Sequence, residues 1–336
     1  MKKSSVFFTI FLVVVLLLPL TAVFGGGKGE EAEGDSKYPN RPIQWIVPWG
    51  EDNESVAMGR ILADEMGKIL GVNIVVSAMP GGSGSKALHH VLSKPSDGYI
   101  LLDGWVAPLI FVVLNRPDIG YTHDDFEPIG HIAFMPFTLV VREDDDRFET
   151  LDKFVEYGRA NPGKMTFNAT GAISVPHAVM ATFLKKAGVD AKGVPYPGLG
   201  AGIKDFLGGT LDFSIGNFWV IKTYGKETKT LCVFMDERHP WFPDLPTAKE
   251  LGYDPGFGNS GMGWDTLIVK KGTPEPILRK LRDAYKQAAT NPAVIKRLRD
   301  MNFWLNYKDP EEAKQLWIDS YNNLEEGVTV LKEKTQ

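Results

Sequence analysis

Small and hydroxyl-bearing residues recur in loops that each follow an apolar strand pattern and precede a helix pattern. The four loops span residues 50–55, 80–85, 169–174 and 197–202. A helix N-terminus offers backbone N–H donors and the positive end of the helix dipole, which suits an anion such as a carboxylate. Glycine lets a ligand approach the backbone, and Ser83, Ser85, Thr170 and Ser174 add hydroxyl donors. Since ligands of open α/β folds bind at such strand ends, four equivalent loops predict a ligand site in a cleft.

The chain lacks the common signatures of catalytic, nucleotide and metal sites. It has no His-Glu-x-x-His pair, no Gly-x-Ser-x-Gly elbow and no phosphate-binding loop, and its single Cys232 lies in an apolar strand pattern. The glycines at 198–202 begin like a dinucleotide fingerprint, but Ile203 stands where its third glycine is required. We therefore expect no enzyme activity, no metal and no cofactor, and a receptor is the favoured function class.

His177 leaves an alternative open, because it lies early in a predicted helix behind the loop at 169–174. Its imidazole can satisfy backbone groups at the helix start, contact a ligand, or act with a loop serine in a secreted hydrolase. Flat apolar rings can also enclose a small ligand, which makes four tryptophans candidate cleft walls or core residues. These are Trp49, Trp105, Trp219 and Trp264.

Length, composition and charge limit the number of domains and the kinds of partner that the protein can have. The 336 residues suit two domains, and 43% hydrophobic content is ordinary for a globular chain. The formal net charge of -5 argues against a nucleic-acid partner, which normally meets a basic face.

The first 25 residues resemble a secretory signal peptide. A basic start at Lys2 and Lys3 precedes an apolar run to Phe24, and small residues follow at 25–27. Cleavage near Gly25 is expected, with an uncleaved anchor as the alternative, and no cysteine is present there for lipidation. Residues 26–37 are expected to form a flexible polar tether. The signal peptide predicts that the mature protein lies in the periplasm.

From residue 43 onward, apolar strand patterns alternate with amphipathic helix patterns, which is typical of α/β layers. Expected strands lie at 43–49, 73–78, 99–102, 137–141, 165–168, 211–215, 230–235 and 267–269. Expected helices lie at 55–70, 85–92, 151–160, 175–187, 200–207, 276–289 and 309–331, the last opening with a capping box at Asp309 and Glu312. We expect a discontinuous first lobe of residues 38–137 and 267–336, and an inserted second lobe of residues 138–266.

Short motifs spread over nearly the whole chain resemble one family, the Bug-type extracytoplasmic solute receptors of tripartite tricarboxylate transporters. They include YPNRPI at 38–43, PGGSG at 80–84, PSDGYILL at 95–102, NPGK at 161–164, VPYPG at 194–198 and DFLGG at 205–209. The resemblance implies a fold like that of type II periplasmic binding proteins, in which each lobe has a mixed, mainly parallel sheet flanked by helices. It implies a monomer that closes over a small organic acid and delivers it to membrane permease subunits.

In that family the ligand's carboxylate is held by loops of both lobes, which here match residues 50–55, 80–84, 169–174 with His177, and 216–219. With the candidate tryptophans, the predicted ligand-contact residues are Trp49, Gly50, Asn53, Ser55, Gly82, Ser83, Gly84, Trp105, Thr170, Gly171, Ser174, His177, Asn217, Trp219, Trp264 and Asp265. A sensor without a transport role and an adhesive envelope protein are the remaining alternatives.

The first loop departs from the family pattern, because it carries Glu51, Asp52 and Glu54 in a stretch where glycines are usual, and Val56 where an aspartate is expected. Like charges 4 Å apart at an effective dielectric near 20 repel by about 4 kcal/mol. Acids that face the cleft therefore disfavour a tricarboxylate and favour a ligand with an amine, an amide or fewer charges. Acids that face solvent have no such effect.

Overall fold

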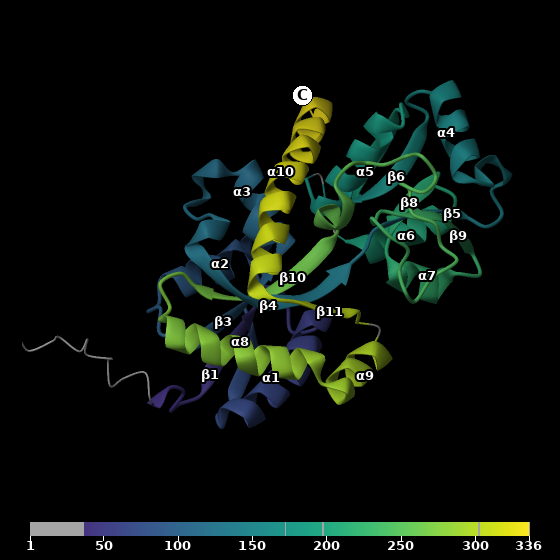
Figure 1. Ribbon diagram of the computed structural model, residues 1–336. Helices are drawn as coiled ribbons and strands as arrows, with labels where there is room; N and C mark the ends of the chain where they lie inside the picture. Colours follow the sequence, from purple (N-terminus) through teal and green to yellow (C-terminus); the bar gives the residue numbers. More distant parts are fainter. Residues whose placement is uncertain (1–36, 172, 197, 302, 336) are drawn as a thin grey trace, which may run out of the picture.

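Two separate β-sheets, each flanked by helices, organise the molecule (Figure 1). The computed structural model describes residues 37–171, 173–196, 198–301 and 303–335. The predicted signal peptide and, apart from Lys37, the predicted tether lie outside the described residues. Within the described part of the chain, no helix combines the length and the apolar character needed to cross a membrane.

The first sheet has the strand order β11-β4-β10-β3-β1-β2. Its strands are β1 (Ile43–Val47), β2 (Ile74–Ala78), β3 (Ile100–Trp105), β4 (Phe126–Met135), β10 (Gly263–Lys270) and β11 (Leu305–Lys308). Its helices are α1 (Glu54–Leu70), α2 (Ser85–Leu92), α3 (Val112–Asn115), α8 (Glu275–Thr290) and α9 (Pro292–Asp300). Because α1 packs with α8 on one face and α2 packs against β3 and β10, apolar residues of the sheet are buried on both sides.

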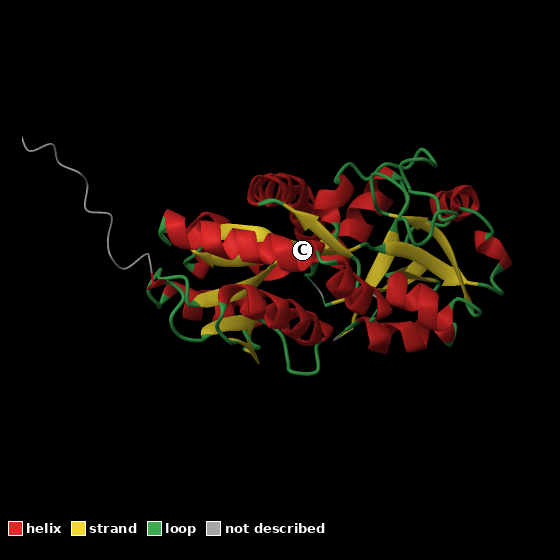
Figure 2. Ribbon diagram, turned by 60° about the horizontal axis from the view of Figure 1, so that its bottom comes forward, coloured by secondary structure: helices red, strands yellow, loops and turns green. Residues whose placement is uncertain are grey.

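The second sheet has the strand order β7-β6-β8-β5-β9. Its strands are β5 (Thr138–Arg142), β6 (Met165–Thr170), β7 (Ala191–Tyr196), β8 (Phe213–Gly216) and β9 (Thr228–Val233). Helices α4 (Leu151–Ala160), α5 (Val175–Lys186), α6 (Leu199–Leu207) and α7 (Phe218–Tyr224) flank it. Figure 2 shows the two sheets as separate groups of strands along the long axis of the molecule.

The predicted class, two α/β lobes with mixed sheets, is confirmed, but the sheets are less parallel than expected. Among the named strands of the described chain, parallel pairing is limited to β1 with β2 and β3, and to β6 with β7 and β8. The strands next to the lobe connections, β4, β5 and β10, pair antiparallel with their neighbours because the chain crosses between the lobes there. The proposed lobe boundaries stay a prediction, although β10 already pairs in the first sheet from Gly263 rather than from residue 267.

Helix α10 (Pro310–Thr335) closes the chain and contacts both lobes, lying against β4 and against α5. The predicted capping box opens it, because the Asp309 amide donates to Glu312 Oε2 over 3.0 Å and the Glu312 amide donates to Asp309 Oδ1 over 2.9 Å. Gly327 permits the close approach to α5, since a Cβ there would lie 2.9 Å from the Cβ of Ala178. Elements that the sequence patterns did not predict are β4, β7, α3, α7, α9 and β11.

Candidate functional site

Two neighbouring cavities open where the lobes face each other, and both are lined by Trp105 and Met135. The first, here called the large cavity, has a volume of about 830 Å³. The second, the small cavity, has a volume of about 150 Å³. Trp105 ends β3 and Met135 ends β4, so the two strands bring the walls of both cavities to one edge of the first sheet.

The large cavity joins two of the predicted small-residue loops. Gly82 and Ser83 follow β2 in the first lobe, while in the second lobe Thr170 ends β6 and Gly171 and Ser174 follow it. Ser83 has a φ of 54°, a left-handed conformation that non-glycine residues adopt rarely. Trp49 and Trp105 line the same cavity, with ring centroids 6.4 Å apart in an edge-on contact.

Ser174 forms the N-cap of α5 at the wall of the large cavity. Its Oγ accepts a hydrogen bond from the backbone N–H of His177 over 3.3 Å and lies 3.1 Å from the Thr170 hydroxyl. The positive end of a helix of 12 residues therefore meets two hydroxyls at this wall. Among the described residues that line the large cavity, the charged ones, Arg116 and Lys332, are both basic. This arrangement suits an anionic group.

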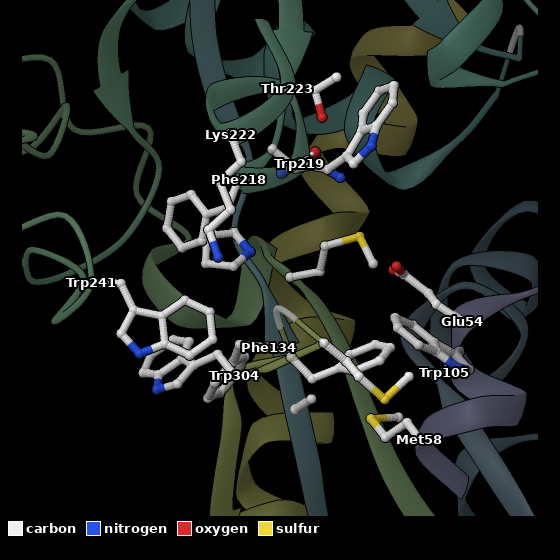
Figure 3. A pocket seen from close by; sticks show the side chains of 16 residues that line it. Glu54, Met58, Trp105, Phe134, Phe218, Trp219, Lys222, Thr223, Trp241 and Trp304 are labelled. Carbon is white, nitrogen blue, oxygen red and sulfur yellow. Dashed lines mark hydrogen bonds between the residues drawn. The ribbon is translucent and has the colours of Figure 1, made fainter. Parts of the chain in front are cut away.

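The small cavity is lined by aromatic and sulfur-bearing side chains from both lobes (Figure 3). Its described lining residues include Met58, Trp105, Phe134, Met135, Phe218, Trp219, Trp241, Met301, Phe303 and Trp304. Two charged side chains, Glu54 and Lys222, also line it, and the Lys222 Nζ lies 4.8 Å from the centroid of the Trp241 ring. Asn217, a predicted site residue, caps α7 by accepting hydrogen bonds from the amides of Trp219 and Val220.

The structure separates the acids of the first loop. The Glu51 carboxylate is held outside the cavities, since it pairs with Arg60 over 2.9 Å and accepts the Ala78 amide over 3.2 Å. Glu54 lies in the first turn of α1 and lines the small cavity, where its side chain stays exposed while partial loss of water raises the pKa of its carboxyl. Asp52 is exposed and is not among the described lining residues of either cavity.

Nine of the predicted contact residues line a cavity, and seven do not. Those in the cavities are Trp49, Gly82, Ser83, Trp105, Thr170, Gly171, Ser174, Asn217 and Trp219. Those outside the described cavity walls are Gly50, Asn53, Ser55, Gly84, His177, Trp264 and Asp265.

Most of these seven have structural roles. Asn53 caps α1 by accepting the Ser55 amide over 2.9 Å, and Ser55 itself is buried. Gly84 has a φ of 93° and packs so closely on Pro108 that a Cβ would lie 2.8 Å away. The His177 ring is mostly buried and meets the edge of Phe167 with centroids 5.6 Å apart.

Trp264 and Asp265 lie away from both cavities, because β10 lies in the middle of the first sheet and both side chains are fully buried. For Trp264 this is the core position that the sequence left open as the alternative to a cleft wall. The Trp264 indole donates to the Ser320 hydroxyl of α10 over 2.8 Å. Asp265 lies near Asp103 of the neighbouring strand, whose carboxylate accepts a hydrogen bond from the Trp45 indole. Burial raises the pKa of Asp103 to about 7, and burial followed by the charge of Asp103 raises the pKa of Asp265 well above its ordinary value.

The sequence analysis missed most of the small cavity. Phe134 lies in β4, Phe218 in α7, and Trp241 and Trp304 in connecting segments. No common spacing links these residues, because they meet only after the two lobes are assembled. Of its lining, the sequence pointed to Trp105, Asn217 and Trp219, and to the acidic first loop, of which Glu54 reaches the cavity.

Comparison with known proteins supports the same reading of the fold. A family model described as the tripartite tricarboxylate transporter family receptor matches residues 58–331. A UPF0065 protein of Pseudomonas sp. strain P51, from the tcbD-tcbE intergenic region, is 30% identical over 286 residues, which cover 83% of each chain. Protein BugT of Bordetella pertussis is 29% identical over 262 residues, which cover 77% of this chain and 79% of BugT.

Solved structures share the two-lobed architecture. A TctC solute-binding protein from Polaromonas, without ligand, aligns with a TM-score of 0.75 and 25% identity over 87% of this chain and 99% of its own. MatC from Rhodopseudomonas palustris, with bound malate, aligns with a TM-score of 0.65 and 26% identity over 89% of this chain and 100% of its own.

Proposed function

Since the chain belongs to the tripartite tricarboxylate transporter receptor family, we propose that it captures a small organic acid between its lobes and delivers it to the permease subunits of such a transporter. The family consists of solute-binding receptors and is not a class of enzymes. The predicted signal peptide supports a periplasmic location for the mature protein, which we expect to act as a monomer.

The lining of the large cavity is the observation that supports an organic acid as the ligand. The capped N-terminus of α5 and hydroxyls of both lobes meet there, and the described charged residues of its wall are basic. Hydroxyls and the positive end of the helix dipole at such a terminus stabilise a bound carboxylate. We propose Ser83, Thr170 and Ser174 as the hydroxyl contacts, with Trp49 and Trp105 against the apolar part of the ligand. The malate bound to MatC, a related structure, agrees with this class.

The test replaces the hydroxyl at the α5 terminus. In Ser174→Ala the ligand loses one hydroxyl contact, so we expect its dissociation constant to rise about tenfold, the equivalent of roughly 1.4 kcal/mol. The variant also loses a helix cap, which costs about 1 kcal/mol of folding stability. Calorimetric titration with short carboxylates measures the first effect, and thermal unfolding measures the second.

Thr150→Ala is the matched control, because Thr150 caps α4 by accepting the Lys153 amide over 3.2 Å and lines neither cavity. It should lose similar stability and keep full affinity. Equal affinities of Ser174→Ala and wild type would contradict the proposed carboxylate position.

The hydrolase alternative rests on the closeness of Ser174 and His177, but the Ser174 hydroxyl accepts the His177 backbone amide, which is the geometry of a helix cap. Ester hydrolysis that is lost in His177→Ala would support an enzyme and overturn the receptor proposal. A sensor would be supported by a different pair of results: the purified protein binds the compound, and cells that lack the permease genes still grow on it normally.

A further inference from the structure

The small cavity has the composition of a site for an organic cation. The faces of Trp, Tyr and Phe rings attract a cation through their negative quadrupole, and indoles do so most strongly. Trp105 and Phe134 reach this cavity from the first sheet, and Trp219 reaches it from α7. Trp241 and Trp304 complete the aromatic walls seen in Figure 3.

Glu54 adds a negative charge to this aromatic wall. In Figure 3 its carboxylate points into the cavity beside Trp105. Within the described chain, no hydrogen bond or ion pair holds this carboxylate, and loss of water around it raises its pKa. A carboxylate in such surroundings is stabilised by a cation that enters the cavity.

Lys222 lines the same cavity but lies toward the opposite side from Glu54, next to Trp241 (Figure 3). Its ammonium group already contacts the indole face, which shows that rings of this cavity accept a cation. The acid therefore faces the centre of the cavity from the first lobe, while the lysine is engaged at the wall of the second lobe.

The size of the cavity limits what enters. Liquid water occupies about 30 Å³ per molecule, so a volume of about 150 Å³ has room for about five heavy atoms. A substituted ammonium group is of this size. The two cavities share Trp105 and Met135, so they adjoin at these two side chains.

We propose that the ligand is a zwitterion of the betaine class, with its carboxylate in the large cavity and its quaternary ammonium group beside Glu54 in the small cavity. This inference rests on the proposed carboxylate-binding function and specifies the other end of the same ligand. A dicarboxylate of similar length would place its second carboxylate near Glu54, and at 4 Å this repulsion corresponds to about a thousandfold loss of affinity.

The test uses pairs of compounds that differ only in the charged atom. Glycine betaine is compared with 3,3-dimethylbutanoate, and 4-(trimethylammonio)butanoate with 5,5-dimethylhexanoate, in calorimetric titrations of the purified protein. Each pair has the same shape, because a quaternary nitrogen replaces a quaternary carbon. We expect at least one ammonium compound to bind tenfold or more tightly than its neutral partner.

Two variants of one loop localise the effect. Glu54→Gln should weaken binding of the ammonium compound about tenfold or more and leave binding of the neutral partner unchanged or tighter. Glu51→Gln, which removes an acid held outside by Arg60, should change neither affinity. Thermal unfolding of both variants checks that they are folded.

Failure of this inference is distinguishable from failure of the proposed function. Equal binding of both members of every pair, or equal effects of the two variants, overturns the cation assignment. If carboxylates then still bind and Ser174→Ala weakens them, the receptor proposal stands without it. If neither charged nor neutral carboxylates bind at all, both proposals fail.

Discussion

At the scale of single residues, burial decides which acidic groups are available to a ligand. Asp103 and Asp265 are fully buried on adjacent strands, whereas Glu54 is exposed to a cavity. The raised pKa of Asp103, about 7, means that this carboxyl holds a proton in the folded chain at pH values where the unfolded chain has released it. The pair is therefore a feature of the sheet core, not of the ligand site.

The Asp pair makes stability depend on pH in a defined direction. Between pH values of about 4 and 7 the folded chain binds more protons than the unfolded chain, so the free energy of unfolding falls as pH rises. One such group contributes a slope of up to about 1.4 kcal/mol per pH unit.

We expect Asp103→Asn, which keeps an oxygen acceptor for the Trp45 indole, to make this slope shallower. Urea unfolding at several pH values measures it, with the exposed Asp118→Asn as the control that keeps the wild-type slope. If Asp103→Asn keeps the wild-type slope, the aspartate pair is not the source of this pH dependence of the free energy of unfolding.

At the scale of elements, the helix α10 joins the lobes. Two buried indoles fix it to β10, because Trp264 donates to Ser320 over 2.8 Å and Trp317 donates to Thr266 over 3.3 Å. Toward its C-terminal end it lies on α5, where Lys186 pairs with Glu326 over 3.2 Å. Helix α5 carries Ser174 at its start, so this packing also supports the wall of the large cavity.

The contact of α10 with α5 depends on the absence of a side chain at position 327. In Gly327→Leu the new side chain would collide with Ala178 and Thr182, and we expect a loss of about 1–3 kcal/mol in the free energy of unfolding. Asn322→Leu, which introduces the same side chain at an exposed position of α10, should cost much less. Similar losses in both variants would mean that the two helices do not need their close approach.

Local patterns predicted the elements and loops that local chemistry determines. The loops that contain Ser83 and Ser174 were recognisable because small and hydroxyl residues stand between a strand and a helix. The walls formed by Phe134 and Trp241 were not, since their meeting depends on the packing of two lobes. For Trp264 the sequence could not decide between cleft wall and core, because a strand buried on both faces has no polar side to mark its orientation.

At the scale of the whole molecule, the chain divides into two sheets that face each other across the two cavities. The connection between β4 and β5 is short, and β10 returns to the first sheet, so we propose that the lobes close over a ligand as rigid bodies about these crossings. The proposed ligand contacts come from both lobes, which is how binding would favour the closed form.

The chain has a formal net charge of -5, but the two cavities differ in the sign of the charged side chains that line them. The described charged residues of the large cavity are basic, and Glu54 stands in the small cavity. A ligand that matches both ends is therefore oriented by charge before the lobes close.

The most direct test of the receptor account is a calorimetric titration of the purified protein with short carboxylates and zwitterions, followed by mass spectrometry of the recovered compound. We predict binding of one molecule per chain and recovery of that molecule unchanged. Chemical conversion of a bound compound, or no binding of any member of either class, would contradict the account.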